Sequence, residues 1–190
     1  MKMHFLTIRI VLLGVMYLLL LSPGIGLAAP KVGDRFGNWT FACMAIGPGN
    51  TKCGLTQDVV SRSSGKRILK ATLGYLGKSG ELILVLRTPL NLYLPTGVVA
   101  NIDSGLKRRM VLQQCKKNGC IAVAKISQSF QDELFLGSRM RIKFKIILKE
   151  GIVGIPVKIN LNGTQKGIQA LEKSRIGDGY NQKNEQLPIF

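Results

Sequence analysis

This chain of 190 residues contains a single histidine, His4, and only ten acidic residues. Almost the whole chain therefore lacks the Ser–His and Cys–His pairs of nucleophilic catalysis, and it lacks histidine as a metal ligand. Only two carboxylates, Asp132 and Glu133, are adjacent in sequence, and neighbours on a strand point to opposite faces. We predict a protein that is not an enzyme and has no cofactor or metal. A carboxylate pair assembled by folding, as in glycoside hydrolases, is the alternative.

Long apolar runs are confined to the N-terminus. Lys2 and Arg9 accompany an apolar run from Ile10 to Leu21, and a small-residue site ends at Ala28. This order is typical of a secretory signal peptide. A transmembrane anchor is the alternative, but spanning a bilayer needs about 20 apolar residues and this run is shorter. We predict that residues 1–28 are a signal peptide and that the protein is exported.

Cysteine is scarce but even in number: Cys43, Cys53, Cys115 and Cys120. In an exported chain such a set indicates disulfides, for which three pairings exist. The local pairing, 43 with 53 and 115 with 120, is the most economical. Asn118-Gly119 supports it, because this dipeptide favours a hairpin turn that brings 115 and 120 face to face. A zinc site is the alternative, and it lacks both C-x-x-C spacing and histidine.

Strand-like segments separated by turn residues fill most of the chain. Leu82 to Leu86 is apolar at every position, as in a strand buried on both faces. The segments from Arg139 to Ile146 and from Val153 to Leu161 alternate between two faces, which indicates half-buried strands. Pro156 removes one ladder hydrogen bond, so its strand is expected at a sheet edge or with a bulge. Many short strands around one core predict an all-β protein, a β-sandwich, with a small closed barrel as the alternative.

Helical periodicity is recognisable near the C-terminus. Thr164 is placed to cap a short helix with Ile168 and Leu171 on its buried side. We predict one domain over residues 29–173 and a flexible tail over residues 174–190, where the sequence becomes polar.

Positive charge is in large excess, with 27 Lys and Arg residues and a net charge of +17. Arg139, Arg141, Lys143 and Lys145 occupy every second position, so they project from one strand face about 6.6–6.8 Å apart. Like charges in a row repel, which favours an anionic partner; a solvated outer face is the alternative. Further cations around a neighbouring hairpin are expected to extend this patch: Lys107, Arg108, Arg109, Lys116 and Lys117.

Nucleic acid is not the predicted partner of this patch. Aromatic residues make up 6% of the chain, and none interleaves with the basic row to stack on bases, because Phe144 alternates onto the other face. The predicted partners are anionic lipid headgroups of the envelope, anionic groups of a host-cell surface, or an acidic protein.

Five short motifs follow one another between Phe36 and Leu171. They are F-G-N-W-T from Phe36, C-G-L-T-Q from Cys53, P-L-N-L-Y-L-P-T-G-V from Pro89, Q-C to G-C-I-A over 114–122, and L-N-G from Leu161. In this order and spacing they resemble the invasion-associated locus B family of bacterial envelope proteins.

This resemblance implies an immunoglobulin-like β-sandwich with local disulfides. It also implies a location in the periplasm, at the outer membrane or on the cell surface. Some members take part in host-cell invasion, notably of red blood cells, and the family offers no established catalytic residues. We therefore expect an exported protein that promotes erythrocyte invasion through non-catalytic binding. A periplasmic structural or accessory protein that binds anionic envelope components is the alternative.

Overall fold

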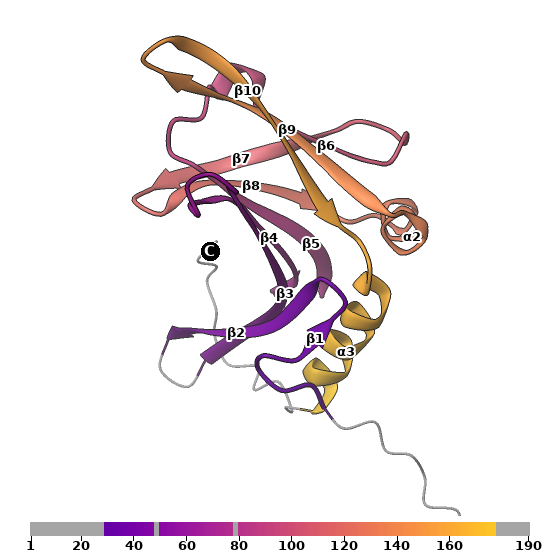
Figure 1. The fold of residues 1–190 in the computed structure, drawn as a ribbon. Coiled ribbons are helices and arrows are strands. Elements are labelled where there is room, and N and C mark those ends of the chain that lie inside the picture. Colours follow the sequence, from indigo (N-terminus) through magenta and orange to yellow (C-terminus); the bar gives the residue numbers. More distant parts are fainter. Residues whose placement is uncertain (1–28, 48–49, 78–79, 178–190) are drawn as a thin grey trace, which may run out of the picture.

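The computed structural model describes residues 29–47, 50–77 and 80–177. The predicted signal peptide, residues 1–28, and positions 178–190 of the predicted tail lie outside the described residues. Within them, ten strands form one antiparallel sheet in the order β1-β2-β3-β4-β5-β8-β7-β6-β9-β10 (Figure 1). The elements are β1 (Arg35–Phe36), β2 (Trp39–Gly47), β3 (Asn50–Val60), β4 (Arg67–Leu76), β5 (Glu81–Thr88), the 3₁₀ turn η1 (Leu94–Thr96), β6 (Val98–Ile102), β7 (Arg108–Lys116), β8 (Gly119–Lys125), α2 (Gln128–Leu136), β9 (Arg139–Leu148), β10 (Gly151–Asn160) and α3 (Thr164–Gly177).

Strand β7 carries the sheet from one layer to the other. Its residues 108–110 pair with β6, whereas its residues 111–116 pair with β8. Strands β1–β5 and β8 therefore form one layer, and β6, β9 and β10 form a second layer that crosses it (Figure 1). Strand β10 also contacts β3 and β4 of the first layer. This arrangement confirms the predicted all-β sandwich with a C-terminal helix.

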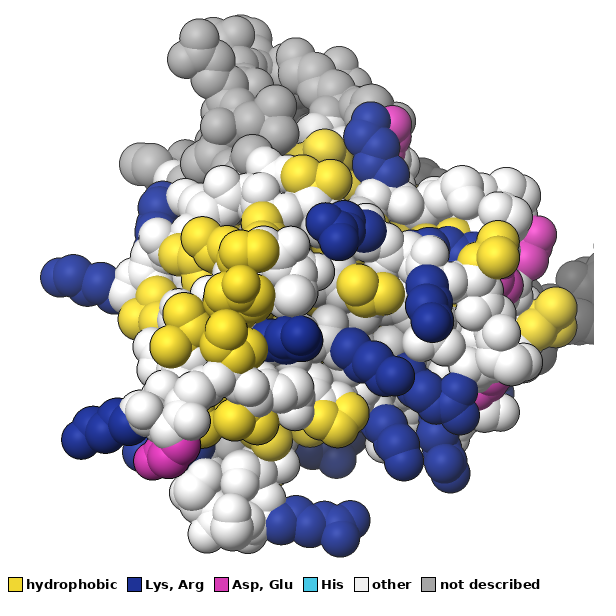
Figure 2. Space-filling model, turned by 90° about the horizontal axis from the view of Figure 1, so that it is seen from above, with side chains coloured by type: hydrophobic (Ala, Val, Ile, Leu, Met, Phe, Trp, Pro, Cys, Tyr) yellow, Lys and Arg dark blue, Asp and Glu magenta, His cyan; other side chains and the backbone are white. Residues whose placement is uncertain are grey.

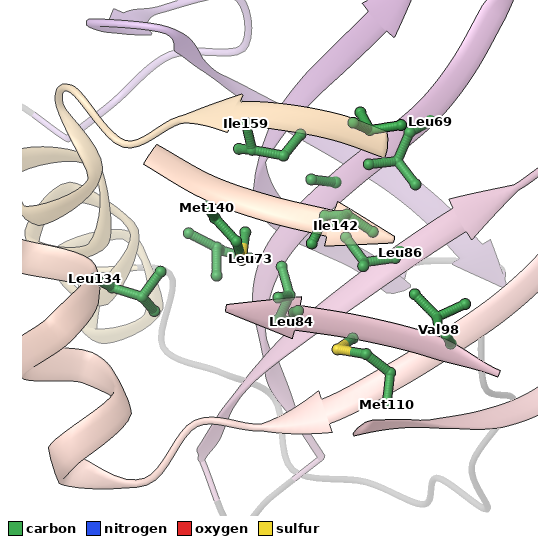
Figure 3. Packing of buried hydrophobic residues seen from close by; sticks show 14 of the residues in the cluster. Leu69, Leu73, Leu84, Leu86, Val98, Met110, Leu134, Met140, Ile142 and Ile159 are labelled. Carbon is green, nitrogen blue, oxygen red and sulfur yellow. The ribbon is translucent and has the colours of Figure 1, made fainter. Parts of the chain in front are cut away.

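The main core lies between the two layers. Leu73 and Leu84 from the first layer pack in one cluster with Met140 and Ile142 from the second, and all four side chains are fully buried (Figure 3). Each such side chain contributes roughly 2 kcal/mol of transfer free energy when it leaves water. The alternation along β9 thus supplies one wall of the core, as its sequence period predicts.

Strand β5 is buried on both faces, as its continuous apolar sequence predicts. Its even-numbered residues, such as Leu84, belong to the main core. Its odd-numbered residues Ile83 and Val85 form a small second cluster with Ile121 of β8 on the other face.

Two segments far apart in sequence hold each other at one end of the domain. The Asn38 N–H donates to the Asn162 carbonyl at 3.1 Å. The buried indole Nε1–H of Trp39 donates to Thr164 Oγ1 at 2.9 Å, and that hydroxyl donates to the Leu161 carbonyl at 2.6 Å. We call these two segments, residues 36–39 and 161–164, the clasp. The clasp joins the start of β2 to the start of α3.

Two glycines allow the clasp to close. Gly37 and Gly163 have φ angles of 58° and 85°, a region that side chains disfavour. A Cβ atom on Gly163 would lie 2.1 Å from the Phe36 carbonyl oxygen, and one on Gly37 would lie 2.4 Å from the Asn162 carbonyl oxygen. Both backbones therefore approach more closely than any other residue permits.

The structure has a second helix, α2, whereas the sequence led us to expect a single helix near the C-terminus. Ser127 accepts a hydrogen bond from the Phe130 N–H at 3.3 Å and so caps it, and Phe130 and Leu134 are buried one turn apart. Asp132 and Glu133 lie on this helix, not on a strand. The capping serine and the i, i+4 apolar pair are helical signals that a strand-based interpretation of this part of the sequence overlooked.

Helix α3 confirms the predicted helix and extends it. Ile168 and Leu171 are buried, as expected. Residues 174–177 are helical too, so the tail does not begin at 174: Ser174 is buried and its hydroxyl donates to the Leu171 carbonyl at 2.7 Å, while Arg175 stacks on the Tyr75 ring at 4.1 Å. Within the described residues, no helix has the length and apolarity needed to cross a bilayer.

Strand β10 is the last strand of the sheet, which accounts for Pro156. This proline lies opposite Lys143 without a shift of register. Of the two expected settings, edge strand or bulge, the structure has the edge.

Candidate functional site

The four cations predicted to share one face of a strand do so on β9. Arg139, Arg141, Lys143 and Lys145 are exposed, and the residues between them are buried. The buried residues fix the direction of their exposed neighbours, because a strand held on one side by the core presents alternate side chains to solvent.

Register adds two cations to this row. Lys158 of β10 lies opposite Arg141, and Arg109 of β7 lies across β6 from Lys143, with Val99 between them. Residues opposite each other in an antiparallel sheet point to the same face. We name the six exposed cations the basic face: Arg109, Arg139, Arg141, Lys143, Lys145 and Lys158. Sequence reasoning missed Lys158, because only the pairing of β10 with β9 places it beside Arg141.

Arg108 does not belong to the basic face, contrary to expectation. Its guanidinium holds the Glu133 carboxylate of α2 in two hydrogen bonds, one of them 2.9 Å from Nη1 to Oε2. It also stacks on the Phe130 ring, 4.3 Å from the centroid. Alternation along β7 explains the difference, because Arg109 points outward and its neighbour Arg108 points to the side where α2 packs.

The remaining predicted cations lie at other places on β7. Lys107 is exposed in the turn before the strand, at the end where β9 begins. Lys116 and Lys117 are exposed at the β7–β8 turn, about 23 Å along the strand from Arg109 at 3.3 Å per residue. The structure therefore does not bring Lys116 and Lys117 into the row.

Asp103 organises the start of the basic face. Its carboxylate accepts from the backbone N–H groups of Ser138 at 2.8 Å and Arg139 at 3.2 Å. Its carbonyl accepts from Asn101 Nδ2 at 2.7 Å and from the Arg141 guanidinium. Asp103 also has a φ of 43°, the left-handed region. The carboxylate of Asp103 thus positions the start of β9, and its backbone carbonyl holds Arg141.

Beyond Lys145 the same hairpin becomes apolar and exposed. We call its end the apolar tip, formed by Ile147, Leu148, Ile152 and Val153, which are 49%, 41%, 51% and 40% exposed. Ile147 and Ile152 lie opposite each other on the same face as Lys145. Viewed from above, hydrophobic side chains gather on one half of this side of the molecule and Lys and Arg on the other (Figure 2). Exposed apolar surface beside charge is typical of interaction surfaces.

The cysteines form the local disulfides that the sequence favours. Cys43 bonds to Cys53 and Cys115 to Cys120, each across a cross-strand pair with a Cα–Cα distance of 3.9 Å. All four thiols are thereby used, and the described residues include no free cysteine.

Three of the carboxylates that the structure describes pair with separate cations. Glu81 pairs with Lys125 at 3.0 Å, Asp58 lies near Arg67 at 3.6 Å, and Glu133 binds Arg108. No group of three or more Cys, Asp or Glu residues with metal-binding geometry occurs among residues 29–47, 50–77 and 80–177. The described residues offer instead a cationic surface, the basic face, which is suited to binding an anionic surface.

Comparison with known proteins points to one family. The profile described as "Invasion associated locus B (IalB) protein" matches residues 39–172. The crystal structure of invasion associated protein b from Bartonella henselae superposes with a TM-score of 0.65 at 17% sequence identity, covering 77% of this chain and 99% of that chain. Among curated proteins, none matches the chain significantly.

Proposed function

The chain belongs to the invasion associated locus B family, and on this premise we propose that it is an exported bacterial envelope or surface protein that binds anionic surfaces through its basic face. The observation that carries this proposal is the juxtaposition of six exposed cations on neighbouring strands. Two local disulfides fit an oxidising compartment outside the cytoplasm.

Electrostatics favours a partner with distributed negative charge. Arg141 and Lys158 are like charges directly opposite each other, a pair that destabilises a sheet unless an anion compensates it. Each Lys or Arg near an anionic bilayer contributes about 1 kcal/mol of attraction. Six such groups on one side of the molecule therefore support binding to phosphate or carboxylate groups of a membrane surface.

The biological role that we propose is promotion of host-cell invasion, with erythrocytes as the host cells. The basic face would hold the protein against anionic groups of the red-cell surface, without chemistry on the partner. Family membership and the basic face together support this role.

The test compares binding to erythrocyte membranes and to vesicles containing phosphatidylserine. Arg141→Gln, Lys143→Gln and Lys158→Gln together should weaken binding on the order of 100-fold at low salt. The matched control, Lys66→Gln, Lys116→Gln and Lys117→Gln, removes the same net charge elsewhere and should have a much smaller effect. Raising the salt concentration should weaken wild-type binding steeply, because exposed charges are screened.

Two outcomes would contradict the proposal, one on the contact surface and the other on the location of the protein. Salt-independent binding, or equal losses in both triple variants, would show that the basic face is not the contact surface. Salt-dependent binding by a pool that added protease cannot reach on intact bacteria would favour the alternative, a periplasmic accessory protein on anionic envelope components. A deletion strain complemented with Arg141→Glu and Lys143→Glu then tests entry into host cells directly.

A further inference from the structure

The first layer carries a groove on the face turned away from the core. Strands β2 to β5 are strongly bent (Figure 1), and a cavity of about 390 Å³ lies against their outward-facing residues. Ligand pockets of proteins occupy roughly 300–1,000 Å³. This groove is separate from the basic face, which belongs to the other layer.

A row of small residues hollows the groove. Ala42, Gly54, Gly74 and Ile83 lie in register across the four strands and line the cavity. Three adjacent strands thus have no large side chain at this level. A Cβ atom on Gly74 would have its nearest neighbour, the Cys53 carbonyl oxygen, at 3.8 Å. The space over Gly74 is therefore open, not filled by backbone.

Positive charge surrounds this hollow. The described lining residues include no carboxylate and four cations: Lys52, Arg67, Lys70 and Arg87. Lys70 and Arg87 lie directly opposite each other on β4 and β5. Asp58 of β3 lies 3.9 Å from Lys70 and 3.6 Å from Arg67. Among the described residues no acidic group forms an ion pair with Arg87, so an anion at Lys70 and Arg87 would relieve their repulsion.

Along β4 and β5 the groove changes from apolar to cationic, while Lys52 of β3 lies beyond the apolar end. Gly74 and Ile83 mark its apolar end, Val85 lies midway, and Lys70 and Arg87 mark its charged end. The two ends lie four residue steps apart on β4, about 13 Å, which is the reach of a medium-length acyl chain. We propose that this groove binds an amphiphilic anion, with an aliphatic chain over Gly74 and Ile83 and a carboxylate or phosphate group at Lys70 and Arg87.

Titration calorimetry with decanoate and decyl phosphate tests this site in the purified, disulfide-bonded chain. Gly74→Leu fills the hollow without a backbone clash and should weaken binding of both probes about 10-fold or more. The matched control is Gly154→Leu. Gly154 is also a strand glycine, but it lies on the other layer, and no atom lies within 4 Å of a Cβ atom built on it. This control should leave binding unchanged.

A second variant tests the charged end without changing the hollow. Arg87→Gln should weaken both probes roughly 10-fold, whereas Lys143→Gln on the basic face should not. Decanol, which has the same chain without a charge, should bind more weakly than decanoate by a similar factor. Thermal unfolding of each variant shows that the fold is retained.

Each result decides the proposal. It is overturned if the wild-type protein binds neither probe, if Gly74→Leu and Arg87→Gln leave both affinities unchanged, or if decanol binds as tightly as decanoate. Binding of decanoate alone supports the site and identifies a fatty-acid type of ligand. Binding of decyl phosphate alone supports it and identifies a phospholipid type.

Discussion

The β9–β10 hairpin has two unlike ends. At its base, the clasp brings two backbones into contact at Gly37 and Gly163, and Asp103 holds the first residues of β9. At its apolar tip, Ile147 and Ile152 are about half exposed, and no disulfide joins the two strands. A residue larger than glycine does not fit at Gly37 or Gly163, whereas the side chains of the tip and of the basic row are exposed, and we expect substitutions there to be tolerated. One hairpin thus provides stability at its base and exposed surface along its length.

This division also separates two groups of residues that the sequence analysis singled out. The F-G-N-W-T and L-N-G motifs that resemble the family both lie in the clasp. The basic row lies farther along the hairpin, where packing does not dictate the side chains. The proposed binding surface thus follows from residues that the fold leaves free.

The same Gly→Val substitution, made at the base and toward the tip of the hairpin, should give the largest difference in unfolding free energy. Gly163→Val places a branched side chain at a positive φ and 2.1 Å from the Phe36 carbonyl oxygen, so it should cost about 3 kcal/mol or more of unfolding free energy. Gly154→Val meets no atom within 4 Å in an edge strand and should change stability by less than ~0.5 kcal/mol. Urea unfolding followed by the fluorescence of the buried Trp39 measures both. Similar losses in the two variants would contradict the proposed difference between the ends.

The β2–β3 disulfide should have the next largest effect. Cys43→Ala with Cys53→Ala opens a short loop and should cost roughly 2–3 kcal/mol, mainly by freeing the unfolded chain. The first segment of the clasp ends at Trp39, four positions before Cys43, so near-UV circular dichroism of the indole should stay native. A loss of the native indole signal at low denaturant would mean that the clasp depends on the disulfide and does not hold by its own packing.

The sequence predicts the faces of individual strands better than the neighbours that these strands acquire. Alternation alone places Arg141 and Lys143 outside and Ile142 inside, because the period of a strand is a local property. The same alternation cannot show that Lys158 lies beside Arg141, since that depends on the register between β9 and β10.

Long-range contacts also account for the other features that the sequence did not predict. Arg108 points to Glu133, 25 residues away, and only the packing of α2 against β7 reveals that pair. The groove needs Ala42, Gly54 and Gly74 in one row across three strands. By contrast, the 115–120 disulfide follows from a local Asn-Gly turn, and it was predicted correctly.

A smaller effect is expected at the end of α3, where it depends on pH. Burial, with the charge of Glu172, raises the pKa of Tyr75 above 10.0, and Arg175 opposes this shift. The folded state thus holds the phenol proton more tightly than the unfolded state, which stabilises the fold below the unfolded pKa and is lost as pH rises through the folded pKa. Tyr75→Phe should flatten the decline in stability that begins near the unfolded pKa of about 10 and continues above it. If stability declines equally in the variant, titrating groups other than Tyr75 cause the decline.

The smallest effect should come from the basic row itself. Lys143→Gln with Lys145→Gln removes two like charges that neighbour each other on β9 and make no ion pair within the described residues. Unfolding free energy should rise by a few tenths of a kcal/mol at low salt, and the gain should vanish near 1 M salt. A clear loss of stability instead would mean that the row serves the fold. A small gain would show that these charges lower the stability of the fold, as the proposed binding surface predicts.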